Sequence, residues 1–444
     1  MLPLPSADQD LLDRAHPARQ AASVALAVVV TFPGVFLRLT DAHLSDPVLA
    51  LLFGLAIVGA AFLLSWAAEA AQLDVSAGLA IAVLAFIAVL PEYAVDLVFA
   101  IKGGDSFQQF GRECPPLGGG DESPCSLALA NMTGANRLLI GIGWSMVVFI
   151  AWFQWRKRGE RGEARQVTLE PAHSVEIAYL AVATLYSLTL PLKRSITLVD
   201  AAVLVSVFVL YTIRVSRAPA AEPHLVGPAH WVGSFPKPRR RAAVLGMFLF
   251  AATVILLVAE HFADALVGSG QALGVSEFLL VQWLAPLASE APELLVAGLY
   301  AWRLNTDAGL GTLVSSKVNQ WTLLVGTLPI AFAVASGSLH GLPIVGQQRE
   351  ELFLTAAQSL FAVAILASLS MSVREAAMLF VLFFVQFVAG AVGPEAIHDE
   401  VRILTGVVYL VLGVGVLVRT GRRRLGRLAN DGFRVPYATL AEQR

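Results

Sequence analysis

About twelve windows of the sequence are apolar over roughly 20 residues each, the length of a helix that crosses a membrane. A helix rises about 1.5 Å per residue and the hydrocarbon core of a bilayer is about 30 Å thick. Lipid offers no hydrogen-bond partners, so each crossing segment must satisfy its own backbone. The windows therefore predict an all-α polytopic membrane protein with about 12 transmembrane helices, near residues 22–40, 47–68, 75–101, 126–154, 174–191, 197–214, 241–263, 275–303, 308–336, 351–371, 374–391 and 402–419.

The composition agrees with a lipid solvent and excludes several functions. Charged residues make up 14% of the chain, about half their share in soluble domains. The net charge of −2, with basic residues in short clusters, predicts no nucleic-acid partner. Glycines 118–120 lack the Gly-Lys-Ser/Thr ending of a phosphate loop, so no nucleotide is expected. The expected partners are membrane lipid and small cations, without a cofactor or enzymatic activity, and the sequence defines no oligomeric state.

The basic residues predict the orientation. If the N-terminus is cytoplasmic, about 22 of the 31 Lys and Arg residues lie inside. We therefore expect an integral protein of a bacterial plasma membrane with both termini in the cytoplasm. The expected divisions are a cytoplasmic N-terminal segment 1–20, a first membrane half 21–214, a Pro-rich cytoplasmic linker 215–240, a second membrane half 241–419 and a basic cytoplasmic tail 420–444.

Each half contains an apolar segment that ends in Pro-Glu, at Pro91-Glu92 and at Pro292-Glu293. In the predicted orientation the first segment runs outward and the second inward. Two such inverted repeats place a substrate site at the membrane midplane in secondary transporters. Proline cannot donate to the preceding turn, so we expect a helix break at Pro91 and at Pro292.

Carbonyls freed at such breaks, together with the carboxylates that follow, form an oxygen site of the kind that binds Na⁺ or Ca²⁺. The alternative is that both prolines are ordinary kinks and that the glutamates pair with bases. The occurrence of the same pattern in both halves favours the cation site.

The two helix pairs, near residues 66–150 and 260–336, resemble the inverted α-repeats of the calcium/cation antiporter superfamily, the sodium/calcium exchangers and their relatives. Those repeats carry a Gly-Thr-Ser-Leu-Pro-Glu type motif followed by a Gly-Ser-Asn type motif. The resemblance implies that Glu92 and Glu293 bind the transported ions. It also implies ligand positions at Ser289, where the family has threonine, at Asn136 of the second motif, and among the retained hydroxyls such as Ser316.

This sequence departs from the family pattern mainly in its charges. Glu290 replaces a serine before Pro292, and Asp96 adds a carboxylate one turn after Glu92. Lys317 stands where the second Gly-Ser-Asn motif has asparagine, and Arg137 follows Asn136 in the first. Both repeats have therefore gained a base near the expected site.

Charges in the membrane interior are expensive, so we expect these acids and bases to face the bundle interior and pair with one another. Four carboxylates against Arg137 and Lys317 leave a surplus of two negative charges, which matches one divalent cation or two monovalent ones. We further expect Lys317 to compete with a cation for Glu293 and Glu290 and to lose its proton when the cation binds. The alternative is a structural network in which the bases occupy the cation positions permanently.

The predicted function is a secondary cation antiporter that exchanges Ca²⁺ for Na⁺ or H⁺ by alternating access. The alternatives are a Na⁺/H⁺ exchanger, a non-transporting sensor or assembly subunit, and a transporter of an anionic or organic solute neutralised by Arg137 and Lys317. Outside the site, Cys114 and Cys125 fall in a connection on the predicted outer face. There they could form a disulfide or remain free thiols.

Overall fold

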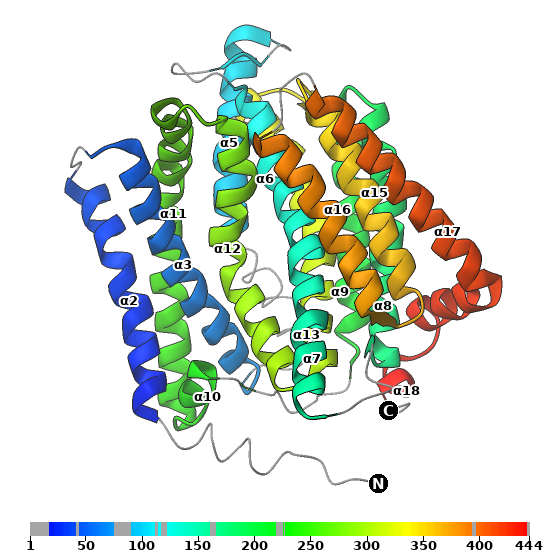
Figure 1. The fold of residues 1–444 in the computed structure, drawn as a ribbon. Helices are drawn as coiled ribbons and strands as arrows, with labels where there is room; N and C mark the ends of the chain where they lie inside the picture. Colours follow the sequence, from blue (N-terminus) through cyan, green and yellow to red (C-terminus); the bar gives the residue numbers. More distant parts are fainter. Residues whose placement is uncertain are drawn as a thin grey trace.

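The computed structural model describes residues 17–40, 44–74, 90–111, 114–116, 122–159, 166–218, 225, 227–392 and 397–441. These residues form a bundle of long, closely packed helices (Figure 1), which confirms the predicted all-α fold. Among them, nine helices are long and apolar enough to cross a membrane. The expected segment 1–20 up to residue 16, and the first part of the predicted span 75–101, lie outside the described residues.

Three helices form a group at one side of the bundle, the left side in Figure 1. They are α2 (Pro17–Thr40), α3 (Asp46–Ala71) and the long α11 (Lys237–Leu273). The short helix α10 (Pro228–Gly233) packs against α3. Alanines on α3 are fully buried, so its backbone lies close to that of α11. We call α2, α3 and α11 the peripheral group.

The centre of the bundle contains the two inverted repeats. The first comprises α5 (Leu90–Phe110), α6 (Pro124–Leu138), the π-helical segment η2 (Leu139–Trp144) and α7 (Ser145–Lys157). The second comprises α12 (Glu277–Trp302), α13 (Thr306–Asn319), the π-helical segment η5 (Gln320–Leu324) and α14 (Val325–Ser336). Helix α5 packs against α14 and helix α12 against α6, so each repeat is completed by the other.

The matching π-helical segments support the alignment of the repeats. Segment η2 begins three residues after Asn136, and η5 begins three residues after Lys317. Segments of this kind are rare in helices and are frequent at functional sites. Asn136 and Lys317 therefore occupy equivalent positions in the two repeats.

The remaining elements surround the repeats, and short strands among them pair with one another. Two short antiparallel ladders pair β1 with β4 and β2 with β3, linking the two halves of the chain. The elements are β1 (Gln166–Thr168), η3 (Pro171–His173), α8 (Ser174–Ser187), η4 (Leu190–Leu192), β2 (Ser195–Ile196), α9 (Leu198–Val215), β3 (Leu342–Pro343), α15 (Gln348–Leu366), β4 (Ser370–Ser372), α16 (Val373–Val392), α17 (His398–Phe433) and α18 (Tyr437–Ala441).

The structure answers two predictions about local geometry. Cys114 and Cys125 form a disulfide at the end of the bundle where α5 ends and α6 begins. The helix break expected at Pro292 is wrong, because α12 continues through that residue without interruption. A proline removes one hydrogen bond of the ladder, and neighbouring packed helices allow a membrane helix to continue past it. Helix α5 begins at Leu90, and the residues before Pro91 lie outside the described part.

Candidate functional site

Two buried carboxylates from different repeats meet at one glutamine. Glu92 lies in the first turn of α5 and Glu290 near the middle of α12. The Nε2 of Gln320, the first residue of η5, donates to Glu290 Oε1 at 2.7 Å and to Glu92 Oε1 at 3.4 Å. Glu290 and Gln320 are 0% exposed and Glu92 is 1% exposed. The amide thus bridges two acids that the fold brings together in the centre of the protein.

The other two predicted carboxylates flank this pair. Asp96 lies one turn after Glu92 on α5 and is fully buried, and its Oδ1 accepts a hydrogen bond from Asn131 Nδ2 on α6 at 2.7 Å. Glu293 lies on α12 beside Glu290 and is partly exposed. It lines a cavity, so this carboxylate is the one that water reaches.

Several buried oxygens at this place have no hydrogen-bond partner within the described residues. Buried polar atoms in proteins are nearly always satisfied by protein, water or an ion, so such a group of unpaired oxygens has room for water molecules or a cation as its partners. Carboxylate, amide and hydroxyl oxygens are the donors that hard cations such as Ca²⁺ prefer. The unpaired atoms are Glu92 Oε2, Asp96 Oδ2, Glu290 Oε2, Gln320 Oε1, Asn319 Oδ1 and Ser316 Oγ.

No group of three acidic, histidine or cysteine side chains converges as a metal site within the described part of the chain. A cation held here would therefore combine a few carboxylate oxygens with amide and hydroxyl oxygens. Ca²⁺ accepts such a mixed set of carboxylate, amide and hydroxyl oxygens.

A cavity of about 450 Å³ connects this place to one end of the bundle. Glu293, Ser316 and Asn319 line it, together with His173 and Tyr300. This is the end where α7 finishes and α13 begins, as the hydrogen bond from the Glu170 backbone to Asp307 shows. Of the predicted ligands, Glu293 and Ser316 are thus accessible to solvent from that end.

Lys317 does not lie between Glu290 and Glu293. Its Nζ donates to Asn136 Oδ1 at 2.5 Å and to Asn136 O at 3.0 Å, and it lies 4.7 Å from the centre of the Trp321 ring. Lys317 and Asn136 occupy equivalent positions of the inverted repeats, so their contact lies near the axis that relates the repeats. Asn136, predicted as an ion ligand, has its side-chain oxygen occupied by this lysine.

Arg137 does not join the midplane acids, contrary to the expectation from the sequence. Its Nη2 pairs with Glu351 Oε2 on α15 at 2.5 Å, its Nη1 donates to Gln386 Oε1 at 2.9 Å, and its guanidinium lies 4.9 Å from the Trp283 ring centre. Successive helical residues differ by about 100° in direction, so Arg137 points away from Asn136. Among the described residues, the four carboxylates therefore have one of the two predicted bases, Lys317, in their vicinity, which leaves a formal surplus of three negative charges instead of two.

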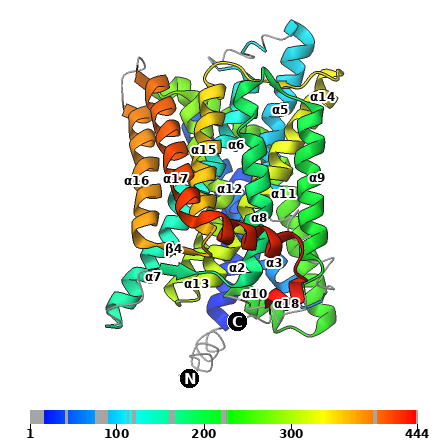
Figure 2. The same ribbon diagram turned by 90° about the vertical axis from the view of Figure 1, so that its right-hand side faces the viewer.

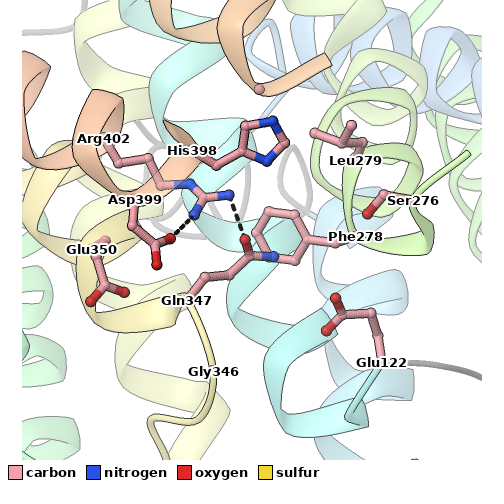
Figure 3. Close-up of a pocket in the computed structure, with 11 residues that line it drawn as sticks. Glu122, Ser276, Phe278, Leu279, Gly346, Gln347, Glu350, His398, Asp399 and Arg402 are labelled. Carbon is pink, nitrogen blue, oxygen red and sulfur yellow. Dashed lines mark hydrogen bonds and ion pairs between the residues drawn. The ribbon is translucent and has the colours of Figure 1, made fainter. Parts of the chain in front are cut away.

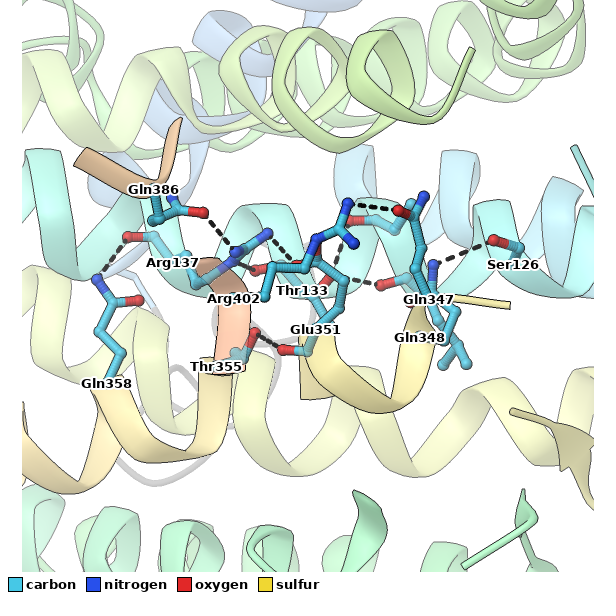
Figure 4. Close-up of polar contacts among 12 residues, drawn as sticks. Ser126, Thr133, Arg137, Gln347, Gln348, Glu351, Thr355, Gln358, Gln386 and Arg402 are labelled. Carbon is cyan, nitrogen blue, oxygen red and sulfur yellow. Dashed lines mark hydrogen bonds and ion pairs between the residues drawn. The ribbon is translucent and has the colours of Figure 1, made fainter. Parts of the chain in front are cut away.

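Glu351 is shared by two arginines in a buried polar network (Figure 4). Arg402 of α17 pairs with Glu351 Oε1 at 2.8 Å and with Asp399 at 2.7 Å. Four buried polar residues of α15 follow one face at intervals of three or four residues. They are Gln348, Glu351, Thr355 and Gln358.

This network ends at a pocket of about 510 Å³ at the end of the bundle that carries the disulfide (Figure 3). Arg402, Asp399, His398 and Gln347 line it. Its lining includes none of the midplane carboxylates, so this pocket and the solvent-accessible site are separate.

The remaining predicted residues occupy the same region. Ser289 is buried on α12, and its hydroxyl lies 3.2 Å from the carbonyl of Pro286 within the same helix. Gln320 and Asn131 contact the carboxylates and were not predicted. The signal for Gln320 was its spacing, because it follows Lys317 by three residues and so shares its helix face.

A family model described as sodium/calcium exchanger protein matches residues 46–217 and 243–392. No curated protein sequence matches. The chain is similar to the crystal structure of an H⁺/Ca²⁺ exchanger, CAX, at 39% identity, with 96% of this chain and 99% of that chain covered and a TM-score of 0.83. The structure of native YfkE, at 14% identity, a TM-score of 0.55 and coverage of 87% and 100%, shows likeness of fold alone.

Proposed function

The chain belongs to the sodium/calcium exchanger family and is an integral membrane cation antiporter, and on that premise we propose that it exchanges Ca²⁺ for H⁺. The observation that carries this proposal is the pair of buried carboxylates, Glu92 and Glu290, bridged by Gln320 and surrounded by unpaired oxygens. The similarity to an H⁺/Ca²⁺ exchanger supports the choice of ions.

Charge balance explains why protons suit this site. Four carboxylates beside one lysine cannot all remain charged in a dry interior without a partner. Ca²⁺ neutralises two of the negative charges when it is bound. When it leaves, protons on carboxylates such as Glu92 and Glu290 restore the balance, so binding of one cation excludes the other.

In the proposed mechanism, Glu293 is the first ligand that an ion meets. It is partly exposed and lines the cavity, whereas Glu92 and Glu290 lie deeper. The ion passes from Glu293 to the deeper carboxylates, and Ser316 and Asn319 contribute oxygens. Asp96, whose Oδ1 accepts a hydrogen bond from Asn131, provides a further carboxyl group one turn after Glu92.

Alternating access requires the site to open toward one end at a time. An ion pair between Lys102 of α5 and Asp264 of α11 joins the central repeats to the peripheral group at the end opposite the cavity. We propose that this conformation admits ions from the cavity end only. Sliding of the peripheral group against α5 and α12 would break the ion pair and open the other end.

The position of Arg137 disfavours the alternative of an anionic or organic substrate. That alternative needs both bases at the site, whereas Arg137 pairs with Glu351 outside it. Lys317 alone, engaged by Asn136, cannot balance an anion against four carboxylates.

We further propose that the cavity opens to the cytoplasm of a bacterial cell. The basic segments 215–240 and 420–444 then lie in the cytoplasm, and the membrane halves 21–214 and 241–419 carry one repeat each. The disulfide lies at the oxidising face in this orientation, where it is stable.

Transport into proteoliposomes tests the proposed ions. We expect an imposed pH gradient to drive ⁴⁵Ca²⁺ uptake by the purified protein, and Glu92→Gln and Glu293→Gln to abolish it. Glu375→Gln, which removes an acid that caps α16 outside the site, is the matched control and should transport normally. Uptake driven by a Na⁺ gradient and insensitive to the pH gradient would reject the proton as counter-ion.

A further inference from the structure

The C-terminal part of α17 changes direction where it leaves the predicted membrane span. Gly421 interrupts the helical backbone with φ 76° and ψ 155°, a conformation that favours glycine. Figure 2 shows the following residues running across α8 toward α18, transverse to the bundle. We call residues 422–433 the transverse helix. Because the span ends directly before it, the transverse helix lies at the level of the membrane surface.

The transverse helix is docked on α8 and α9. Leu428 and Gly432 are buried, and a Cβ at Gly432 would lie 2.3 Å from the Ala178 Cβ, so only glycine allows this approach. Phe433 packs edge-on against Tyr179 with ring centres 5.1 Å apart. These contacts fix one face of the helix against the protein.

Arg214 of α9 fixes the end of the same helix. Its Nε donates to the Gly432 carbonyl at 3.2 Å, and its Nη2 donates to the carbonyls of Asp431, at 3.4 Å, and Val435. A cation at the C-terminal end of a helix satisfies free carbonyls and complements the helix dipole. The transverse helix is therefore held in one orientation.

Four arginines of the docked helix are open to the surroundings of the protein. Arg422, Arg423, Arg424 and Arg427 are all exposed. At 3.6 residues per turn, Arg423 and Arg427 share one face, which is turned by roughly 100 to 140° from Leu428. The only acid of the segment is Asp431, so the exposed surface is strongly positive.

We propose that the transverse helix binds the headgroups of anionic phospholipids. Clusters of four or more basic residues directly beyond a membrane span are attracted to anionic lipid, and long arginine side chains reach the headgroup level from a helix lying on the surface. The rigid docking keeps the arginines at that level. The position of the arginines directly after a membrane span favours a lipid headgroup over a soluble polyanion as the ligand.

The docking site places this surface next to the ion cavity. The Ser174 carbonyl, which Gly432 approaches, lies on α8 between His173 and Glu176, and both of these line the cavity. We infer that lipid bound to the transverse helix stabilises the position of α8 at the mouth of the cavity. Lipid binding should therefore stabilise the folded protein as well as occupy the arginines.

Native mass spectrometry of the full-length protein in neutral detergent tests the site with phosphatidylglycerol and phosphatidylcholine as probes. We expect wild type to retain phosphatidylglycerol in preference, and the combined Arg422→Gln, Arg423→Gln, Arg424→Gln and Arg427→Gln variant to bind it roughly tenfold or more weakly. The four corresponding Arg→Lys changes should keep the preference. A control that removes basic residues at the end of α7 (Arg156→Gln, Lys157→Gln, Arg158→Gln) should also keep it.

Thermal melting of the same variants provides a second readout. Phosphatidylglycerol should raise the Tm of wild type and of the lysine variant, and leave that of the glutamine variant unchanged. Gly432→Leu, which retains every arginine but displaces the helix from α8, should lose this stabilisation. Equal retention of phosphatidylglycerol by wild type and the glutamine variant would overturn the proposal. Displacement of the lipid by equimolar inorganic phosphate would also overturn it, because the site would then be one for soluble anions.

Discussion

At the scale of single residues, Gln320 is the least expected member of the site. One amide nitrogen contacts carboxylates from both repeats, and the amide oxygen has no partner among the described residues. The side chain therefore holds Glu92 and Glu290 in reach of one cation and can supply a third oxygen itself. A leucine of similar size would keep the packing and remove both contributions.

We predict that Gln320→Leu weakens Ca²⁺ binding by roughly tenfold or more, since hydrogen bonds to charged groups contribute about 1.5 to 3 kcal/mol each. Isothermal titration with Ca²⁺ measures the change. Gln358→Leu is the matched control, because Gln358 is an equally buried amide that contacts the Arg137 backbone outside the site. Equal affinities in wild type and Gln320→Leu would show that the bridge has no role in binding.

We also predict that Lys317→Gln changes the pH dependence of Ca²⁺ transport. Lys317 is the one base that the described part of the chain places near the four acids, and its removal alters how many protons the site must hold to stay neutral. Glutamine can still donate to Asn136, so the contact at the repeat axis is kept. Transport rates in proteoliposomes across a pH series are the measurement, and an unchanged profile would exclude Lys317 from proton coupling.

The sequence predicts part of the site. The acids Glu92, Asp96, Glu290 and Glu293 could be recognised because a charge inside an apolar span has few structural reasons to exist. The amide partners of those acids were harder to recognise, because a buried amide such as Gln320 carries no charge signal and only its spacing from Lys317 points to it. The direction of Arg137 depended on α15, a helix more than 200 residues away in the chain.

At the scale of elements, the network around Glu351 joins three helices. Arg137 of α6 and Arg402 of α17 share this carboxylate of α15, and the side chains of Arg137 and Glu351 are 1% and 3% exposed. A buried charge without its partner is strongly destabilising. The network is therefore a point where α6, which carries Asn136, is fixed against the outer helices.

Glu351→Gln should lower the free energy of unfolding by about 3 to 5 kcal/mol, because it leaves two buried arginines without their shared carboxylate. A large fall in Tm in detergent is the expected observation. The adjacent Glu350→Gln should have little effect, since Glu350 is partly exposed and lines a pocket. Similar Tm values for wild type and Glu351→Gln would mean that the network contributes little to stability.

The peripheral group carries a pH-sensitive contact where α3 ends. Arg240 of α11 bonds both carboxylate oxygens of Asp74, at 2.6 and 2.9 Å. The hydrogen bond from Arg240 lowers the pKa of Asp74 below its ordinary value of 3.8. The contact between Arg240 and Asp74 therefore stabilises the folded protein fully above the unfolded-state pKa of 3.8. This stabilisation is lost as the pH falls through the lower pKa that Asp74 has in the folded state.

Comparison of wild type with Asp74→Asn tests this contact. The variant should melt at a lower temperature by a constant amount from neutral pH down to roughly pH 5, and the difference should shrink in stronger acid. A difference in Tm that grows as the pH falls would contradict the assigned direction of the pKa shift.

Helices were easier to predict than their interruptions. Nine predicted spans coincide with apolar helices among the described residues, because length and hydropathy are properties of the local sequence. The continuity of α12 through Pro292 and the two π-helical segments depend on packing between repeats, which no local pattern reports. Tertiary context decides whether a proline breaks a membrane helix.

At the scale of the whole molecule, the inverted repeats explain why one site is built from both halves. Helix α5 packs on α14 and helix α12 on α6, so Glu92 and Glu290 approach each other from opposite directions. The Pro-Glu pairs of the sequence predicted this architecture, and the match to the sodium/calcium exchanger family confirms it. The net charge of the site could not be predicted from the sequence, because only the structure shows that one of the two bases, Arg137, lies elsewhere.

The central claim is that Ca²⁺ and protons compete for the carboxylates of this shared site. Titration of Ca²⁺ into the purified protein, repeated in buffers with different ionisation enthalpies, gives the number of protons released per Ca²⁺ bound. We predict proton release by wild type, a reduced number for Glu92→Gln and an unchanged number for Glu375→Gln. Ca²⁺ binding without proton release, or release unaffected by Glu92→Gln and Glu293→Gln, would contradict the account.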